Sequence, residues 1–195
     1  PYTVTPEGKG PAWSNSLFED NAEFGYGMLL AQNTIRDRLK AKVEKIAEKT
    51  TDEAVKAAAA EYLETYTVGA TNGTATDKLV AALEACDCDC EDKADVLKNK
   101  DFLAKKSQWI FGGDGWAYDI GFGGVDHVLA SGKDINVMVF DTEVYSNTGG
   151  QSSKSTPTGA IAQFAAGGKE TKKKDMASIA MSYGLSLIHI FEPTR

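Results

Sequence analysis

The sequence has 195 residues, of which 42% are hydrophobic and 25% charged, enough to bury one ordinary hydrophobic core and too few for two comfortable domains. Its formal net charge of -7 argues against a surface that binds nucleic acid or an anionic membrane, because those partners need clustered Lys and Arg. No apolar run approaches the ~20 residues that span a bilayer, and no signal-peptide pattern is present, so we expect a cytoplasmic protein.

The first half of the chain has the spacing of apolar residues that is typical of amphipathic helices. Apolar side chains recur at helical intervals from 21 to 49, with charged residues between them. Thr51 precedes two acidic residues and is the predicted N-cap of the next helix. In chain order, the sequence predicts helices over 21–49 and 54–64, a turn over 69–73, a helix through Leu83 and a short helix over 92–100.

The three cysteines of the chain, Cys86, Cys88 and Cys90, lie together in an acidic stretch. An odd and closely spaced set does not fit the disulfide framework of a small secreted domain and suits a reducing compartment. A soft-metal site is one interpretation, but the stretch lacks the fourth Cys or His that tetrahedral coordination needs. A solvated acidic connector between helices is the interpretation that we favour.

The second half of the chain has the pattern strand, helix, strand. Residues 107–111 and 135–140 are short runs rich in apolar residues, and residues 117–131 between them suit a helix that contains glycines. This order predicts a βαβ unit with two parallel strands. Strands of this kind are buried on both faces, which explains why their hydrophobicity is continuous. We therefore expect an α/β fold with a parallel sheet.

Polar residues follow both predicted strands, at the edge where open α/β sheets bind ligands. Asp114 stands between two glycines after the first strand, and Thr142 follows the second. A carboxylate, a hydroxyl and backbone carbonyls are the hard oxygen ligands that Mg²⁺ takes, with phosphate oxygens and water in its remaining positions. Glycine beside Asp114 lets the backbone approach a bulky anion. Alternatively, Gly-Asp-Gly is only a turn, since Gly and Asp dominate turns.

Three longer motifs favour the first interpretation. Residues 17–25, 116–121 and 141–151, together with the Gly-Asp-Gly, are similar to the pyruvate:ferredoxin (or flavodoxin) oxidoreductases. The similarity covers about 1–49 and 105–184. It implies a three-layer thiamine-diphosphate-binding α/β fold, in which a parallel sheet is flanked by helices, with a helical insertion between the two similar regions.

The resemblance also implies roles for single residues. Asp114, Thr142 and the backbone carbonyl of Val144 would bind Mg²⁺, with Thr142 standing where many thiamine enzymes have Asn. Asn147 would hydrogen-bond pyruvate, whereas without the family a turn residue is the simpler interpretation. No catalytic residue is expected in this chain. The residues expected at thiamine diphosphate are Gly113, Asp114, Gly115, Trp116, Thr148, Gly149, Gly150 and Gln151, and Phe18 and Asn21 are further candidates for the thiamine pocket.

The function implied by the resemblance is oxidative decarboxylation of a 2-oxoacid. Pyruvate and coenzyme A would give acetyl-CoA and CO₂, with electrons passing through iron–sulfur clusters to ferredoxin or flavodoxin. The clusters are expected elsewhere in the parent protein and not on Cys86, Cys88 or Cys90. We expect a homodimer that binds neither nucleic acid nor membrane. The alternatives are a sibling oxidoreductase for another 2-oxoacid, and a non-catalytic module that binds phosphate or nucleotide.

The expected organisation is that of an internal segment of a longer protein, since the chain begins without Met. Residues 1–184 would form the thiamine-diphosphate-binding domain, interrupted by the helical insertion at about 50–104. Residues 185–195 instead resemble a translated sequencing-library adapter, so we expect a non-native tail that takes no part in the fold.

Overall fold

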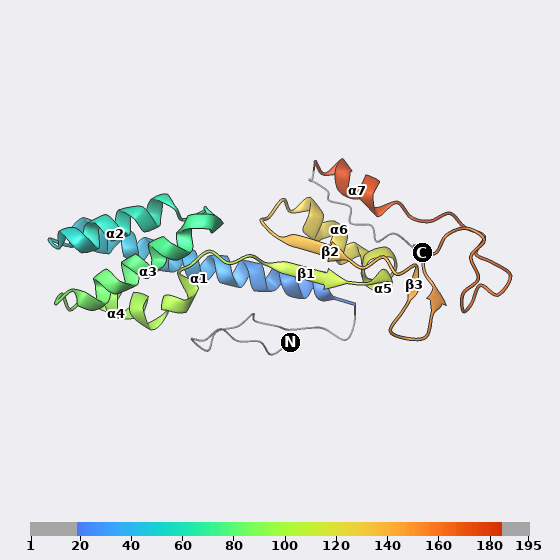
Figure 1. The fold of residues 1–195 in the computed structure, drawn as a ribbon, viewed down its shortest axis with the longest axis horizontal. Helices are drawn as coiled ribbons and strands as arrows, with labels where there is room; N and C mark the ends of the chain where they lie inside the picture. Colours follow the sequence, from blue (N-terminus) through green and yellow to red (C-terminus); the bar gives the residue numbers. More distant parts are fainter. Residues whose placement is uncertain (1–18, 185–195) are drawn as a thin grey trace. The chain divides into compact units, whose positions relative to one another are not determined.

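The computed structural model describes residues 19–184, which form two compact units (Figure 1). The helical unit comprises residues 27–108, and the α/β unit comprises the chain up to Tyr26 and from Trp109 onward. Chain length alone predicted one unit. The helical unit begins within the long helix α1 (Asn21–Lys49), so it contains most of that helix as well as the stretch predicted as an insertion. Among the described residues, no helix is both long and apolar enough to cross a membrane.

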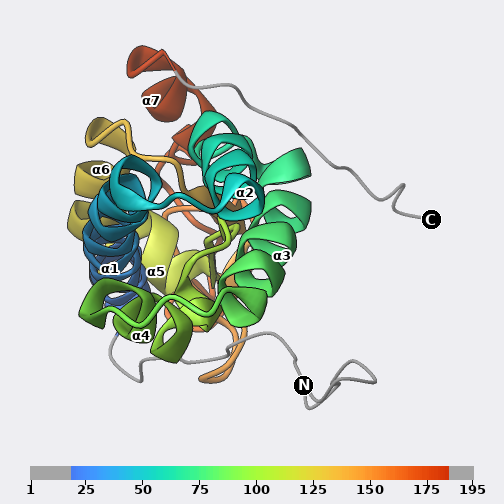
Figure 2. The same ribbon diagram turned by 90° about the vertical axis from the view of Figure 1, so that its left-hand side faces the viewer.

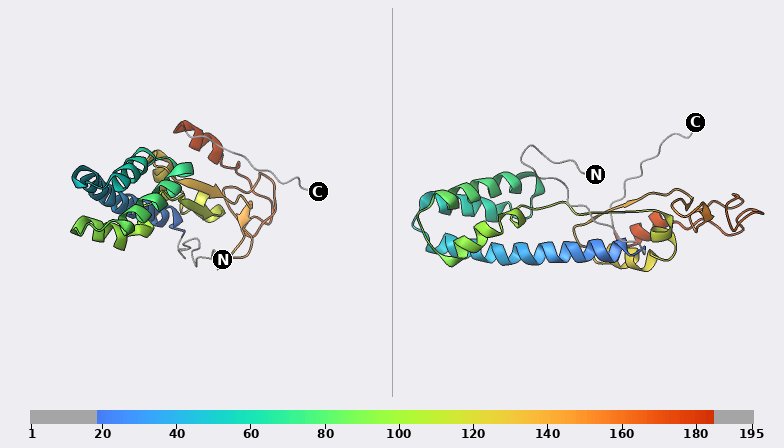
Figure 3. Two further views of the ribbon diagram at one scale, coloured as in Figure 1. Left: turned by 60° about the vertical axis from the view of Figure 1, so that its left-hand side comes forward. Right: turned by 90° about the horizontal axis from the view of Figure 1, so that it is seen from below.

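The helical unit packs its helices around a core of its own (Figures 2 and 3). Its elements are α1 from Gly27 onward, α2 (Glu53–Glu64), α3 (Gly69–Ala85), α4 (Glu91–Lys98) and the short 3₁₀ helix η1 (Lys100–Phe102). Each α-helix contributes fully buried apolar side chains, which include Leu39, Val43, Val55, Tyr62, Leu79, Leu83 and Val96. The predicted long helix is therefore confirmed, and the second and fourth predicted helices agree with α2 and α4 to within two residues.

A buried arginine forms the polar centre of the helical unit. Arg36, on α1, donates through Nε to the carbonyl oxygen of Leu103 at 3.0 Å. Its Nη2 donates to the carbonyl oxygen of Tyr66 at 2.9 Å and to Oδ1 of Asn72 at 3.3 Å. The guanidinium also lies 4.2 Å from the centroid of the Tyr66 ring. One side chain thus joins α1 to α3 and to the segments that follow α2 and η1.

The predicted turn over 69–73 is wrong, because this stretch is the first part of α3. Asn72 is fully buried there, and its Oδ1 accepts hydrogen bonds from Arg36 and from the backbone N of Lys105, the latter at 2.6 Å. Turn preferences of Thr, Asn and Gly are weak compared with tertiary contacts of this kind. The buried polar network therefore decides the helical conformation.

The N-cap of α2 also differs from the prediction by one residue. Asp52 rather than Thr51 caps the helix, because the Asp52 carboxylate accepts hydrogen bonds from the backbone N of Ala54 at 2.9 Å and of Val55 at 3.2 Å. The Thr50 hydroxyl in turn accepts from the backbone N of Asp52 at 3.1 Å. A carboxylate at this position satisfies two N–H groups that have no partner within the helix.

The α/β unit contains the predicted βαβ arrangement. Strands β1 (Trp109–Gly112) and β2 (Asn136–Val139) pair in parallel, with their first residues opposite each other. Helices α5 (Asp114–Tyr118) and α6 (Phe122–Ala130) lie between them in the sequence, where one helix over 117–131 was predicted. The parallel pairing with helices alongside confirms the α/β class, while the helical prediction needs a correction.

Close backbone packing explains the break between α5 and α6. A Cβ at Gly121 would lie 2.4 Å from the carbonyl oxygen of Glu19 and 2.6 Å from that of Trp116. Backbone groups this close leave no room for a side chain, so only glycine fits. Helix α6 therefore begins after this point, with Phe122 as its first residue, and the Glu23 carboxylate of α1 lies next to Gly124.

A second, antiparallel pair, β3 (Val144–Tyr145) with β4 (Gln151–Ser152), follows β2, and α7 (Met176–Ser182) ends the described part of the chain. The core of the α/β unit is lined by Ala22, Ile110, Trp116, Ala117, Val125, Val128 and Met176. On the other face of β1, the ring of Phe111 stacks with Trp109 at a centroid distance of 5.9 Å and with Phe140 at 6.0 Å, and all three rings stay partly exposed. The prediction that the strands are buried on both faces is therefore wrong for β1, because in the described residues only one of its faces is buried.

Candidate functional site

Three oxygen atoms gather beyond the carboxyl ends of the parallel strands. Asp114 begins α5 directly after β1, and Thr142 follows β2. Oδ1 of Asp114 accepts hydrogen bonds from the backbone N of Thr142 at 3.0 Å and from its Oγ1 at 3.3 Å. Thr142 Oγ1 is also 3.0 Å from the carbonyl oxygen of Val144. The residues that the sequence proposed as magnesium ligands therefore lie together, each through the oxygen atom that would bind the metal.

The electrostatic setting of Asp114 suits a cation. Its side chain is only 2% exposed, and in the described residues its hydrogen bonds come from neutral groups, Thr142 and Ser153. A buried carboxylate is costly unless a positive charge or a metal balances it. The same part of the chain holds no cluster of three or more His, Cys, Asp or Glu suited to a metal, so a cation here would depend on one carboxylate and neutral oxygens. Such a ligand set fits Mg²⁺ bound together with phosphate.

A hydroxyl-rich loop, residues 153–156, contacts the site through Ser153, and no role for it was predicted from the sequence. Ser153 Oγ donates to Oδ2 of Asp114 at 2.7 Å, and both side chains are buried. The backbone N of Ser153 donates to Oγ1 of Thr156 at 2.9 Å, and that hydroxyl donates to the carbonyl oxygen of Glu143. The only signal in the sequence is the run of Ser and Thr directly after the expected cofactor loop.

Asp141, beside the metal candidates, is held by several donors. Its carboxylate accepts hydrogen bonds from Tyr118 at 3.0 Å and from the Ser155 hydroxyl, and it pairs with Lys173 at 2.7 Å. Partial burial opposes its ionisation, but the bonds from these three residues outweigh burial and lower the pKa of Asp141. Burial, with the neighbouring Asp141, raises the pKa of Tyr118. Asp141 is thus an ionised anchor that ties α5 to the loop after β2.

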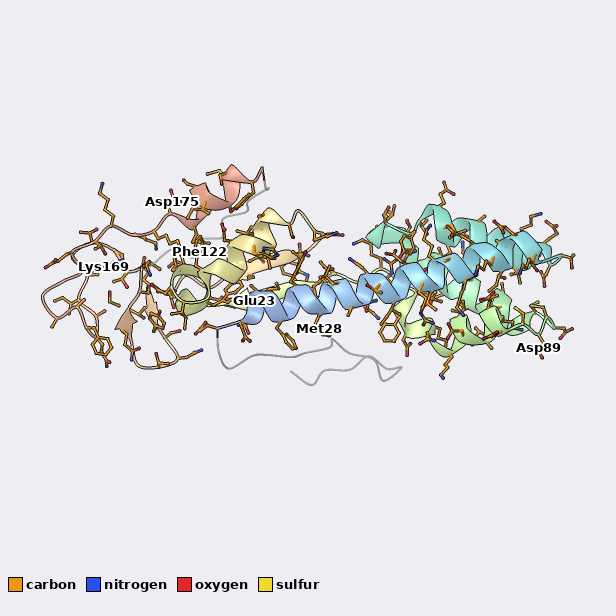
Figure 4. The ribbon with its side chains drawn as sticks, turned by 180° about the vertical axis from the view of Figure 1, so that it is seen from behind. Glu23, Met28, Asp89, Phe122, Lys169 and Asp175 are labelled. Atoms are coloured by element: carbon orange, nitrogen blue, oxygen red, sulfur yellow. The ribbon has the colours of Figure 1, made fainter. Side chains whose placement is uncertain are left out.

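A buried lysine binds the last residue of the hydroxyl-rich loop. Lys169, labelled in Figure 4, is 8% exposed. Its Nζ donates to the carbonyl oxygen of Thr156 at 2.6 Å. Burial lowers the pKa of Lys169. A polar hollow of about 540 Å³ opens beside it, also lined by Asp119, Ser153 and Lys154. Because the three metal candidates do not line this hollow, it is a neighbouring feature and not the proposed metal site.

Glycines of the Gly-Asp-Gly motif sit in different surroundings. A Cβ at Gly115 would lie 2.5 Å from the Tyr145 ring and 3.1 Å from Oε1 of Glu19. At Gly113 the nearest atom among residues 19–184 would be the carbonyl oxygen of Phe140, at 4.0 Å. Burial raises the pKa of Tyr145 to about 12 and also raises the pKa of Glu19. Gly115 is therefore required by protein packing, whereas the space at Gly113 is open to a ligand.

Trp116 lies in the core and not on the surface of the site. Its side chain is fully buried, and its ring would be within 2.2 Å of a Cβ placed at Gly112. Its indole Nε1 has no hydrogen-bond partner among the described residues. Trp116 belongs to α5 together with Asp114 and Gly115, and its side chain anchors this short helix in the core.

The expected cofactor and substrate loop is the hairpin turn between β3 and β4. Thr148 Oγ1 donates to Oε1 of Gln151 at 2.7 Å, and the backbone N of Gly150 donates to the carbonyl oxygen of Tyr145 at 2.9 Å. Gly149 and Gly150 have φ angles of 137° and 80°, which favour glycine. Asn147 is exposed in this turn. Asn21 donates to the carbonyl oxygen of Phe111 at 3.5 Å, and Phe18 lies outside the described residues.

Fold and site together define an α/β module with a candidate cation site at the carboxyl edge of a parallel strand pair. A family model described as "Thiamine pyrophosphate enzyme, C-terminal TPP binding domain" matches residues 94–194, more than half of the chain. The chain belongs to this family. Binding of thiamine diphosphate, expected from the sequence, is a property of the domain family itself.

Similar curated proteins are much longer than this chain. The chain is 56% identical over 189 residues to "Pyruvate:ferredoxin oxidoreductase" of Moorella thermoacetica, covering 94% of the chain and 16% of that protein. It is 52% identical to "Pyruvate-flavodoxin oxidoreductase" of Klebsiella pneumoniae, with the same coverage. It is 48% identical to "Pyruvate dehydrogenase [NADP(+)], mitochondrial" of Euglena gracilis, covering 94% of the chain and 10% of that protein. The resemblance stated from the sequence motifs is confirmed.

Proposed function

We propose that this chain is the part of a pyruvate:ferredoxin or pyruvate:flavodoxin oxidoreductase that holds magnesium and the diphosphate of thiamine diphosphate. The observation that carries the proposal is the meeting of Asp114, Thr142 and Val144 oxygens in a chain of the thiamine pyrophosphate family. The whole enzyme would convert pyruvate and coenzyme A to acetyl-CoA and CO₂. Relatives named for pyruvate with ferredoxin or flavodoxin support this substrate and these electron acceptors.

The proposed metal site uses one charged and two neutral ligands from this chain. Oδ1 of Asp114, Oγ1 of Thr142 and the carbonyl oxygen of Val144 would hold Mg²⁺, leaving its remaining positions for diphosphate oxygens and water. On binding, the Thr142 hydroxyl would turn its proton away from Oδ1 of Asp114. Buried Asp114, which forms no ion pair in the described part of the chain, supports this assignment.

The proposed cofactor contacts surround that metal site. Gly113, Gly115 and the backbone of Trp116 belong to the start of α5 and its preceding residue, and the 148–151 turn supplies the rest. Thiamine diphosphate, when bound, supplies the carbanion chemistry of decarboxylation, and the protein binds and orients it. Asn147, exposed in the same turn, would donate a hydrogen bond to pyruvate.

Iron–sulfur clusters of the proposed enzyme would lie outside this chain. Cys90 caps α4, with its Sγ accepting from the backbone N of Lys93 at 3.4 Å, and Cys86 is buried at the end of α3. The Lys93 ammonium donates to the carbonyl oxygens of Cys86 and Cys88. These local roles support the interpretation of this stretch as a connector between helices. A homodimer and a cytoplasmic location are further parts of the proposal.

The proposed domain covers residues 1–184, of which 19–184 are described. The predicted non-native tail, 185–195, lies outside the described residues, and the family match extends into it, to residue 194. Its origin stays a prediction.

A substrate and cofactor panel on the complete protein tests the proposal. We expect reduction of ferredoxin or flavodoxin with pyruvate, dependent on coenzyme A, thiamine diphosphate and Mg²⁺. A preference for another 2-oxoacid would identify a sibling enzyme. Preferential binding of ATP over thiamine diphosphate, with no 2-oxoacid oxidised, would instead identify a non-catalytic nucleotide-binding module and overturn the proposal.

A further inference from the structure

The Asp114 carboxylate divides its two oxygens between two different loops. Oδ1 faces Thr142, on the side where the metal candidates meet, at 3.0 Å from the backbone N and 3.3 Å from Oγ1. Oδ2 accepts the Ser153 hydroxyl at 2.7 Å. With Asp114 2% and Ser153 4% exposed, water has little access to compete for this bond. The rotation of the carboxylate is therefore fixed from the Ser153 side.

The proton of the Ser153 hydroxyl has one favoured direction. Ser153 Oγ accepts a hydrogen bond from the backbone N of Ser155 at 3.0 Å, which occupies a lone pair and leaves the hydroxyl to donate. Its possible acceptors are Oδ2 of Asp114 at 2.7 Å and Oγ1 of Thr156 at 3.5 Å. The carboxylate is nearer and charged, and bonds to charged acceptors are the stronger ones. Ser153 thus donates to Asp114.

We infer that Ser153 is a positioning residue for magnesium, acting through Asp114. Resting on the proposed function, this inference adds a residue that touches neither metal nor cofactor. By holding Oδ2, the Ser153 hydroxyl keeps Oδ1 directed towards Thr142 and the Val144 carbonyl. Without it, Oδ2 would be a buried acceptor with no partner, and the carboxylate could turn away from the geometry that the metal needs. Partners of this kind typically change metal affinity 10–100-fold.

Calorimetric titration of the cofactor-stripped complete protein with MgCl₂, at saturating thiamine diphosphate, tests this inference. Ser153→Ala should raise the dissociation constant for Mg²⁺ about 10–100-fold. Ser153→Thr, which keeps the hydroxyl, should recover most of the affinity. Ser152→Ala is the matched control, because Ser152 is the adjacent serine and its hydrogen bond to Gln163 comes from the backbone N. The Mg²⁺ affinity of Ser152→Ala should stay within about twofold of the wild-type value.

The titration distinguishes a failure of the Ser153 role from a failure of the proposed function. Wild-type affinity in Ser153→Ala, or an equal loss in Ser152→Ala, would overturn the inference. Asp114→Ala is included because wild-type affinity there would overturn the proposed function, whereas loss in Asp114→Ala alone would overturn only the role of Ser153. If Ser153→Ala does not fold, Ser153→Cys replaces it. Its weakly donating thiol should still lower Mg²⁺ affinity, and wild-type affinity in Ser153→Cys would contradict the role.

Discussion

Asp114 and Asn147 have different surroundings although both were assigned to one site. Asp114 is buried and hydrogen-bonded on both carboxylate oxygens, while Asn147 is exposed in the turn between β3 and β4. A group held in this way is suited to bind a metal with fixed geometry, whereas a group on a turn is suited to meet a substrate that comes and goes. Substitutions of the two residues should therefore impair different properties of the enzyme.

Asn147→Ala should impair use of pyruvate and leave the cofactor in place. In the complete enzyme, kcat/KM for pyruvate should fall by a factor that corresponds to a loss of about 1–3 kcal/mol in transition-state stabilisation, because a hydrogen bond to the bound substrate is lost. The dissociation constant for thiamine diphosphate should stay near the wild-type value. Ser146→Ala, an exposed neighbour in the same turn, is the control for damage to the loop. Weakened cofactor binding with unchanged pyruvate kinetics would remove Asn147 from its assigned role.

The proximity of Asp114 and Thr142 was predictable from the sequence, and the role of Ser153 was not. The carboxyl ends of parallel strands meet at one edge, so residues that follow them come together by topology alone. Ser153 lies 39 residues after Asp114 and reaches it from beyond the β3–β4 hairpin. Neither hydrophobic periodicity nor motif spacing specifies where such a loop returns.

At the scale of elements, prediction succeeded where apolar periodicity was long. Helix α1 and the parallel pair β1–β2 follow directly from the pattern. It failed over 69–73, where buried Asn72 and Arg36 override turn preference, and at Gly121, where two helices replace one. Both failures have the same cause, since single close contacts between distant segments decide the conformation and local sequence does not report them.

Gly112→Ala should loosen the start of α5. A Cβ at this position would come within 2.2 to 2.9 Å of three atoms of the Trp116 ring, which is fully buried and cannot easily move. Amide hydrogen exchange in the complete protein should show that the free energy of local opening at 109–118 falls by about 1–3 kcal/mol.

Gly123→Ala is the matched control for that substitution. Gly123 lies in α6, and a Cβ added there would have no atom of the described residues within 4 Å, so alanine should be neutral or favour the helix by up to about 1 kcal/mol. Equal destabilisation by the two substitutions would show that contact with Trp116 is not the cause.

Arg36→Met should destabilise the helical unit. The substitution keeps an apolar stem of similar length but removes donors to Leu103, Tyr66 and Asn72. The carbonyl oxygen of Leu103 still accepts a hydrogen bond from Tyr62, and Oδ1 of Asn72 still accepts one from Lys105. We therefore expect the free energy of unfolding of this unit to fall by about 2–3 kcal/mol rather than by the sum of three hydrogen bonds. The loss can be measured as reduced protection of the α2 and α3 amides against hydrogen exchange.

The control for Arg36→Met is Arg38→Met on the same helix. The Arg38 side chain is 48% exposed and pairs with Asp95 at 2.7 Å. Exposed ion pairs contribute about 0–1 kcal/mol, so this variant should change protection little. A larger loss from Arg38→Met than from Arg36→Met would contradict the assignment of Arg36 as the polar centre of the unit.

At the scale of the whole molecule, the proposed function makes this chain one part of a larger enzyme. It spans 16% of the Moorella thermoacetica relative, and cofactor clefts at domain interfaces need both walls. The purified 195-residue chain should therefore form no acetyl-CoA from pyruvate and coenzyme A with Mg²⁺, thiamine diphosphate and ferredoxin present. The complete protein, assayed in parallel, is the positive control. Acetyl-CoA above the protein-free blank with the chain alone would contradict this prediction.

The most direct test of the metal and diphosphate site is a titration of thiamine diphosphate into the complete protein at several Mg²⁺ concentrations. Asp114→Ala removes the one charged ligand proposed from this chain, so affinities for the metal and the cofactor should fall together, with activity partly restored by high concentrations of both. Thr142→Val should have the same effect but more weakly, because it removes a neutral ligand. Wild-type cofactor affinity and Mg²⁺ dependence in Asp114→Ala would contradict the assignment.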